Sequence, residues 1–261
     1  MNSQREQWQA SDGPILAEVA RERLFLWQTR IVERITERFQ GTDFIGVGGS
    51  VLTERFNSGS DIDVLVLHAN GESAHNNVLL RCPSCENRLL DVTFMPYFRF
   101  VQLLDMAPHA HSAKFVDFTL GMLALKDELG VAGPLRDHAR RILQAGPGIL
   151  TQTAVDFLRR KILSVLNDAR SGGDAAECRL SHIELIGLLM STTLQWRRSW
   201  TSASLLWTYR SLKDLAQGDE FARRLVNAVD SGEQLEIFSV AQELLRNLGG
   251  VPDDGFSVRV S

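Results

Sequence analysis

Three aspartates in two short apolar segments are the residues whose types and spacing best suit chemistry. Asp61 and Asp63 belong to DIDVLVL (61–67), and Asp91 belongs to LLDVTFM (89–95); both segments are rich in the β-branched and apolar residues typical of strands. Side chains alternate along a strand, so Asp61 and Asp63 share one face. Two neighbouring carboxylates repel each other unless a cation neutralises them. Mg²⁺ suits the pair because it prefers oxygen ligands. Asp91 becomes a third ligand if the two strands are neighbours.

A glycine-serine bend precedes the first of these strands. FIGVGGS (44–50) indicates a short strand that ends in glycines, and VLTERF (51–56) can form a helical turn. Gly49 and Ser50 would then provide a tight turn, close backbone approach, a hydroxyl donor and N–H groups at the start of a helix. These groups suit a triphosphate, so we expect the bend and the carboxylates to face the same cleft.

Together these residues resemble the signature of the nucleotidyltransferase superfamily related to DNA polymerase β, in which Gly-Ser is followed after a short interval by Asp-x-Asp on a strand. Ten residues separate Ser50 from Asp61. Arg55 and Ser60 match positions that commonly hold Arg and Ser in the small-molecule branch, which includes the aminoglycoside and lincosamide nucleotidyltransferases. The resembling segment extends from 46 to 94, and the chain length with a helical C-terminal half is similar to that branch.

The resemblance implies metal-dependent transfer of a nucleoside monophosphate. An acceptor hydroxyl attacks the α-phosphate of a nucleoside triphosphate, and pyrophosphate leaves without a covalent enzyme intermediate. Two Mg²⁺ ions would be held by Asp61 and Asp63, with Asp91 as a further ligand that helps to position or deprotonate the acceptor. The triphosphate, expected to be ATP, would be bound by Gly49, Ser50, Arg55 and Ser60.

Two polar residues of the C-terminal half are further candidates. Glu184 lies in LSHIELIGLLMSTTL (180–194), a helix so apolar that a carboxylate there is paired, exposed on a narrow stripe or facing a site. Its functional alternative is a general base on the acceptor hydroxyl, a role that the helical domain fills in some relatives. Lys213 follows an aromatic-rich run and is a candidate for the triphosphate, with a solvated helix charge as the alternative. We expect Trp207 and Tyr209 of that run to pack in the core, and the alternative is that they line a pocket for a ring.

The cysteines do not suggest the disulfide framework of an exported protein. Their number is odd and no export signal is present, so we expect Cys82, Cys85 and Cys178 to be reduced. Cys82 and Cys85 form a CxxC between two presumed strands, most simply a hairpin turn with two thiols. The alternative is a zinc site, which would need His68 or His75 because the sequence contains no second CxxC.

The elements that position these residues fall into two parts. Apolar residues at helical spacing predict a first helix over 15–40, and a second over 96–111. GMLALKD (121–127) is a candidate for a further strand that closes the sheet. After breaks containing Gly and Pro at 130–135 and 145–150, the spacing is helical almost throughout, over 151–170, 175–199, 203–217, 219–230 and 233–248.

The predicted fold class is therefore α+β, in two domains. Residues 1–147 would form the nucleotidyltransferase catalytic domain, a short mixed β-sheet flanked by helices. Residues 148–261 would form a C-terminal helical bundle, to which the resemblance assigns binding of the acceptor substrate.

The net charge and the distribution of apolar residues limit the kinds of partner that the protein is expected to bind. The chain has 261 residues and a net charge of −4, with 32 acidic residues against 28 basic ones, so we expect no broad positive face and no nucleic-acid partner. The polar N-terminus, MNSQREQWQASDGP, lacks the apolar run of a signal peptide, and no run of about 18 apolar residues follows. We therefore expect a cytoplasmic protein without a membrane partner. The oligomeric state is open, with a homodimer as one option.

The predicted function is transfer of a nucleoside monophosphate to a hydroxyl of a small acceptor such as an antibiotic-like metabolite, with release of pyrophosphate. The nucleoside monophosphate is expected to be AMP. One alternative keeps the chemistry but uses a macromolecular acceptor, a tRNA end or a protein side chain, as in toxin-like relatives. The other is a non-catalytic nucleotide-binding module. The intact set of glycine, serine and aspartates speaks against this last alternative.

Overall fold

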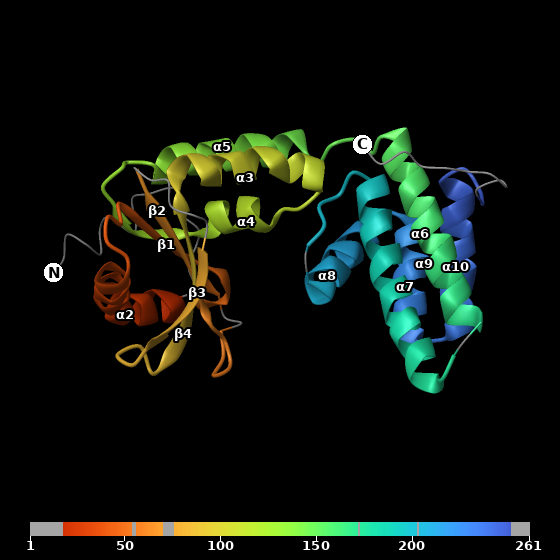
Figure 1. The fold of residues 1–261 in the computed structure, drawn as a ribbon, viewed down its shortest axis with the longest axis horizontal. Coiled ribbons are helices and arrows are strands. Elements are labelled where there is room, and N and C mark those ends of the chain that lie inside the picture. The colour runs from red at the N-terminus through yellow and green to blue at the C-terminus, as the bar shows by residue number, and fades with distance from the viewer. Residues whose placement is uncertain (1–17, 54–55, 70–75, 172, 203, 252–261) are drawn as a thin grey trace. The chain divides into compact units, whose positions relative to one another are not determined.

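The computed structural model describes residues 18–53, 56–69, 76–171, 173–202 and 204–251 (Figure 1). Contacts between residues divide the chain into two compact units. The first contains the residues up to Ala107 together with Lys114–Ala145, and the second contains Pro108–Ala113 and the residues from Gly146 onward. The predicted domain boundary after residue 147 stays a prediction.

A mixed five-stranded sheet forms the centre of the first unit, in the order β3-β4-β2-β1-β5. Its strands are β1 (Phe44–Gly48), β2 (Ile62–His68), β3 (Asn76–Cys82), β4 (Arg88–Pro96) and β5 (Leu123–Asp127). β2 and β4 run parallel, whereas every other neighbouring pair in the sheet is antiparallel. β2 and β4 are therefore direct neighbours although β3 lies between them in the sequence. A third carboxylate ligand depends on this adjacency.

One face of the sheet packs against α2 (Glu18–Arg38). The buried apolar residues of α2 recur at helical spacing, and those of the central strands alternate along the chain. They share one core, which includes Leu24, Trp27, Ile31, Ile35, Ile45, Val47, Ile62, Val64 and Val66. Because this set takes the even-numbered residues of β2, the odd-numbered residues of β2 face away from α2.

The opposite face lies toward α3 (Tyr97–Ala110), α4 (Lys114–Gly121) and α5 (Ala132–Ala145), as Figure 1 shows. Phe118 of α4 fits against Gly48, where an added Cβ atom would lie only 2.4 Å from Cε2 of the ring. A side chain at position 48 would force the two apart, so the glycine sets how closely α4 approaches the end of β1.

The second unit is built from α6 (Gln152–Ser171), α7 (Ala175–Trp196), α8 (Leu205–Leu215), α9 (Glu220–Ser231) and α10 (Gln234–Asn247). These helices share one apolar core. α7 begins with a capping box, in which the Asp174 carboxylate accepts hydrogen bonds from the amides of Ala176 and Glu177, and Glu177 accepts one from the amide of Asp174. This box fixes the start of the helix that carries Glu184.

The predicted fold class is confirmed, as a mixed sheet with flanking helices followed by a helical bundle. The helix predicted over 15–40 is observed as Glu18–Arg38, and residues 15–17 lie outside the described residues. The strand predicted over 121–127 is observed as β5 at the sheet edge. α4 is not predicted, because its eight residues are too few for a clear periodicity. Among the described helices, none combines the length and the apolar character needed to cross a membrane.

The two cysteines of the CxxC are bonded to each other. A disulfide joins Cys82 and Cys85 across the turn between β3 and β4, with their Cα atoms 5.2 Å apart, and both residues are buried in the core beneath α2. The expectation of reduced thiols is therefore wrong for this pair, and it holds for Cys178. Sulfur atoms bonded to each other are not thiolate ligands for zinc. His68 is buried and stacked on Phe94, and His75 lies outside the described residues.

Replacing Ile31 by alanine is expected to lower the free energy of unfolding of the first unit by about 2–5 kcal/mol, because Ile31 is fully buried and its truncation leaves a cavity. Leu26→Ala on the same helix is the matched control, since Leu26 is 65% exposed and should cost less than about 0.5 kcal/mol. Native-state hydrogen exchange of the β2 amides measures both values. Equal losses in the two variants would contradict the packing of α2 on the sheet.

Candidate active site

Asp63 and Asp91 lie side by side on the sheet face opposite α2. Gly48 pairs with Asp63 across β1 and β2, and Asp63 pairs with Asp91 across β2 and β4. Residues in register on neighbouring strands present their side chains on the same face. We call Gly48, Asp63 and Asp91 the acidic row. It places two half-buried carboxylates beside a position that has no side chain.

Asp61 directly precedes β2 and is exposed. The strand predicted to start at this residue begins at Ile62, so Asp61 lies just outside the paired part of the sheet. It follows the turn at 57–60, and the position of its carboxylate therefore depends on that turn as well as on β2.

The electrostatics of the row centre on Asp63. The pKa of Asp63 is raised to about 6, most strongly by burial and then by the negative charges of Asp61 and Asp91, while the positive charge of Lys114 opposes the rise. All three aspartates are therefore close enough to interact. Each carboxylate that ionises makes the next ionisation less favourable, and a bound cation would relieve this repulsion.

The carboxylates fit Mg²⁺ by the chemistry of their donors. In the described part of the chain, no three side chains of His, Cys, Asp or Glu are gathered closely enough to hold a metal ion by themselves. Mg²⁺ commonly takes only one or two protein carboxylates and completes its octahedron with water and substrate phosphates. The in-register pair Asp63 and Asp91, with Asp61 beside it, meets that requirement.

Gly49 lies against the carboxylate of Asp63. Its φ of +76° is in the left-handed region, and an added Cβ atom would be only 1.8 Å from Oδ2 of Asp63. The space beside this glycine is therefore occupied by the carboxylate of Asp63. η1 (Gly49–Leu52) is a single turn of 3₁₀ helix, in which the carbonyl of Ser50 accepts hydrogen bonds from Thr53. Phosphate binding by Gly49 and Ser50 stays a prediction.

Ser60 belongs to the turn that leads into Asp61. Its Oγ accepts a hydrogen bond from the amide of Asn57 at 3.1 Å, so the serine has a structural role there. Binding of the nucleotide by Ser60 stays a prediction. Arg55, the other residue carried by the resemblance, lies outside the described residues.

Lys114 is a residue that the sequence did not single out for this site. It is exposed in the first turn of α4, and its charge acts on Asp63. Its Nζ lies 5.5 Å from the ring centroid of Phe115. The sequence feature that could have identified it is the small number of lysines, because the chain contains only four and Lys114 is one of them.

Glu184 and Lys213 belong to the helical unit. Glu184 is exposed on α7, and its Oε1 lies 3.8 Å from Nζ of Lys161 on α6, so the carboxylate is both paired and exposed. Lys213 is exposed on α8, with its Nζ 5.4 Å from the ring centroid of Tyr209. These contacts account for both residues as surface groups. The catalytic role of Glu184 and the phosphate-binding role of Lys213 stay predictions.

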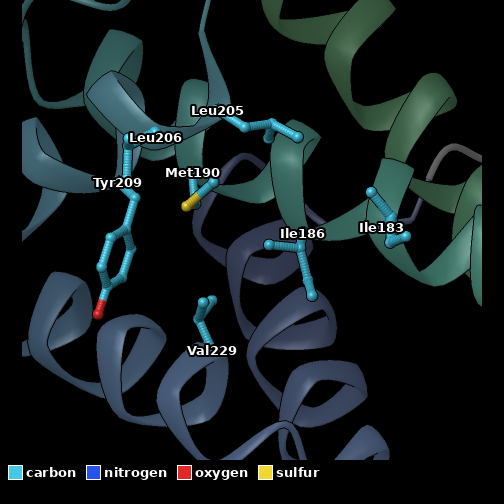
Figure 2. A pocket seen from close by; sticks show the side chains of 7 residues that line it. All are labelled: Ile183, Ile186, Met190, Leu205, Leu206, Tyr209 and Val229. Atoms are coloured by element: carbon cyan, nitrogen blue, oxygen red, sulfur yellow. The ribbon is translucent and has the colours of Figure 1, made fainter. Parts of the chain in front are cut away.

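An apolar hollow of about 230 Å³ opens on the helical unit (Figure 2). Its walls come from α7, α8 and α9: Ile183, Ile186, Met190, Leu205, Leu206, Tyr209 and Val229. The hydroxyl of Tyr209 donates to Asp230, and this bond raises the pKa of Tyr209 to about 12. Tyr209 packs against the apolar core of the unit, as expected, and it also lines this hollow. Core packing is wrong for Trp207, which is 49% exposed and lies under the guanidinium of Arg210.

Asp63→Asn is expected to stabilise the first unit above about pH 6. The raised pKa means that folded Asp63 keeps a proton between about pH 4 and pH 6 that the unfolded chain has released, so wild-type stability falls as the pH rises through this window. The amide cannot ionise, and the variant should lose this fall. Thermal unfolding at several pH values measures the difference, with the exposed Asp137→Asn as the control. If the stability of Asp63→Asn and that of the wild type depended on pH in the same way, the raised pKa of Asp63 would be contradicted.

A family model matches the part of the chain in which these residues lie. Residues 29–115 match the family model of the nucleotidyltransferase domain. The matched segment contains the acidic row, Asp61, η1 and Lys114. None of the curated proteins matches the sequence.

A solved structure similar to this chain is that of a nucleotidyltransferase-like protein from Exiguobacterium sibiricum. It shares 13% sequence identity at a TM-score of 0.49, over 85% of this chain and 73% of that chain. A likeness this distant carries no argument about function. The match shows that residues 29–115 are similar to a nucleotidyltransferase domain, and it supports nucleotidyl transfer as the general activity.

Proposed function

We propose that this protein is a metal-dependent nucleotidyltransferase that transfers AMP from ATP to a hydroxyl of a small, antibiotic-like acceptor and releases pyrophosphate. The observation that carries the proposal is the acidic row. Asp63 and Asp91 are in register on neighbouring strands, Asp61 raises the pKa of Asp63, and all three lie in the segment that matches a nucleotidyltransferase domain.

In this proposal Mg²⁺ is held by Asp61, Asp63 and Asp91. When bound, it supplies the positive charge that stabilises the phosphates and the departing pyrophosphate. The bend at Gly49 and Ser50 binds the triphosphate through its backbone and through the serine hydroxyl. Asp91 orients the acceptor hydroxyl and accepts its proton.

The helical unit is the proposed acceptor-binding domain. The apolar hollow beside Tyr209 offers a surface for the ring of an acceptor, and Glu184 is the candidate for a further base. A small acceptor suits the acidic balance of the chain, which offers no surplus of positive charge to a polynucleotide. We expect the protein to act in the cytoplasm.

Asp63→Asn is expected to lower Mg²⁺-dependent pyrophosphate release by about 100-fold or more, since it removes the central carboxylate of the row. The measurement is pyrophosphate release with each nucleoside triphosphate and pools of hydroxyl-bearing metabolites. Asp137→Asn, on the exposed surface of α5, is the matched control and should keep wild-type activity. Full activity in Asp63→Asn would refute the proposal.

The fate of a labelled nucleotide distinguishes a small-molecule acceptor from a macromolecular acceptor. With α-labelled ATP in a cell extract, label recovered in small molecules supports the proposal. Label in RNA or protein would contradict the small acceptor while leaving nucleotidyl transfer intact. Binding of ATP without any pyrophosphate release would instead indicate a non-catalytic module.

Lys114→Met is expected to raise the KM for ATP by about tenfold and to change kcat much less, because we assign this exposed cation beside Asp63 to the triphosphate. Lys114→Arg keeps the charge and should restore most of the affinity. Steady-state kinetics at saturating Mg²⁺ measure both parameters. A fall in kcat with unchanged KM would argue against phosphate binding by Lys114.

A further inference from the structure

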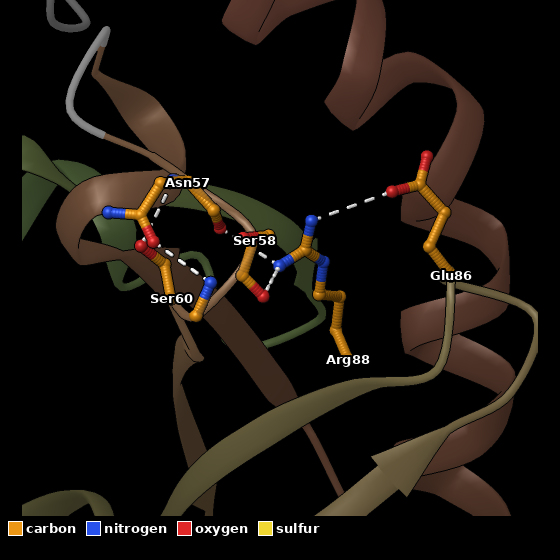
Figure 3. Close-up of polar contacts among 6 residues, drawn as sticks. Asn57, Ser58, Ser60, Glu86 and Arg88 are labelled. Atoms are coloured by element: carbon orange, nitrogen blue, oxygen red, sulfur yellow. Dashed lines mark hydrogen bonds and ion pairs between the residues drawn. The ribbon is translucent and has the colours of Figure 1, made fainter.

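Arg88, the first residue of β4, holds the turn that leads into Asp61 (Figure 3). Its Nη1 donates to the backbone oxygen of Asn57 at 2.9 Å and to that of Ser58 at 2.5 Å. Its Nη2 lies 3.6 Å from Oε2 of Glu86, and the arginine side chain is only 15% exposed. One guanidinium thus binds two consecutive carbonyls of the turn.

Among the described residues, the other hydrogen bonds of the turn are internal to it. The amide of Ser60 donates to the Asn57 carbonyl at 3.1 Å, and the amide of Gly59 donates to Oδ1 of Asn57 at 2.9 Å. The amide of Asn57 in turn donates to Oγ of Ser60. These bonds give the turn its shape but do not attach it to the sheet. The bonds from Arg88 do.

Phe56 provides a second attachment on the same guanidinium. Its ring centroid lies 4.9 Å from Cζ of Arg88 and 6.0 Å from the ring of Trp27, which is buried on α2. A guanidinium can stack on an aromatic face while its in-plane N–H groups bind two acceptors. A lysine ammonium offers the charge without the planar fork.

The position of Arg88 in the strand connects this turn to the acidic row. Ile62, the first residue of β2, pairs with Leu90 of β4, so Asp61 is the first residue beyond that pairing. Arg88 and Asp91 lie on the same strand, in the same short stretch of β4. β4 therefore carries the carboxylate of Asp91. Through Arg88 it also holds the backbone that precedes Asp61.

We propose that Arg88 is a positioning residue that holds Asp61 in place beside Asp63 and Asp91, and so sets the affinity of the site for a divalent cation. This inference rests on the proposed function, in which the three carboxylates bind Mg²⁺. Without Arg88 the turn would have to be ordered when the cation binds, and the ordering would weaken binding.

Hydrogen exchange of the metal-free protein tests the positional part of the proposal. Arg88→Ala should speed exchange of the amides of Asn57, Gly59 and Ser60 by about tenfold or more, while exchange of the β2 and β4 amides stays at its wild-type rate. Arg88→Lys should give an intermediate rate. Glu86→Gln is the matched control, since it removes the ion pair on Nη2 but leaves both carbonyl bonds.

Binding of Mn²⁺ alone tests the functional part. Its paramagnetic broadening of the Asp61 and Asp63 amide signals gives a Kd, which we expect to rise about tenfold in Arg88→Ala, less in Arg88→Lys and not in Glu86→Gln. In the enzyme assay, the Mg²⁺ concentration for half-maximal rate should rise by the same factor, with the KM for the nucleotide unchanged.

Three results would overturn the proposal: unchanged exchange of the turn in Arg88→Ala, faster exchange across the whole sheet, or faster exchange of the turn with an unchanged Kd for Mn²⁺. Because exchange and Mn²⁺ binding require no turnover, they remain decisive if the wild-type protein shows no nucleotidyl transfer. Failure of the proposed function is thereby distinguished from failure of the role of Arg88.

Discussion

Like charges held together by backbone pairing are the constraint on which the first unit depends. The register of β1, β2 and β4 fixes Asp63 between Gly48 and Asp91, and strand pairing holds the backbones that carry the two carboxylates side by side. Partial burial limits the relief that water can give. Such an arrangement lowers the stability of the fold, and costs of this kind are typical of functional sites.

The two glycines beside the row serve different contacts. Gly48 makes room for Phe118, which brings α4 and its Lys114 toward the carboxylates. Gly49 makes room for the Asp63 carboxylate itself, in a backbone conformation that other residues adopt with strain. Both positions lack a side chain because the space is already taken. The glycine bend therefore packs against the acidic row in the protein without a ligand.

Two cations act on the row by different routes. Lys114 acts through its charge, which opposes the rise in the pKa of Asp63. Arg88 acts through the backbone, since its guanidinium binds the carbonyls of the turn before Asp61. The first contribution should weaken as salt increases, whereas the second is made by short contacts of a largely buried group and should not.

Local pattern was sufficient for most of the elements and for the faces of Asp63 and Asp91, but not for the pairing of β2 with β4 that brings the two aspartates together. Alternation in DIDVLVL and LLDVTFM identifies strands and the faces of their aspartates, and helical spacing identifies α2 and the helical unit. Lys114 was missed because α4 is held by its contact with Gly48, which is distant in sequence. The pairing of Glu184 with Lys161 joins two helices, and no single helix pattern contains it.

The disulfide between Cys82 and Cys85 leaves Cys178, partly accessible on α7, as the one free thiol among the three cysteines, all of which lie in the described residues. A maleimide dye or spin label applied without reductant would therefore attach at a single position, in the helical unit. Its signal would report the melting of the bundle separately from that of the sheet, in unmutated protein.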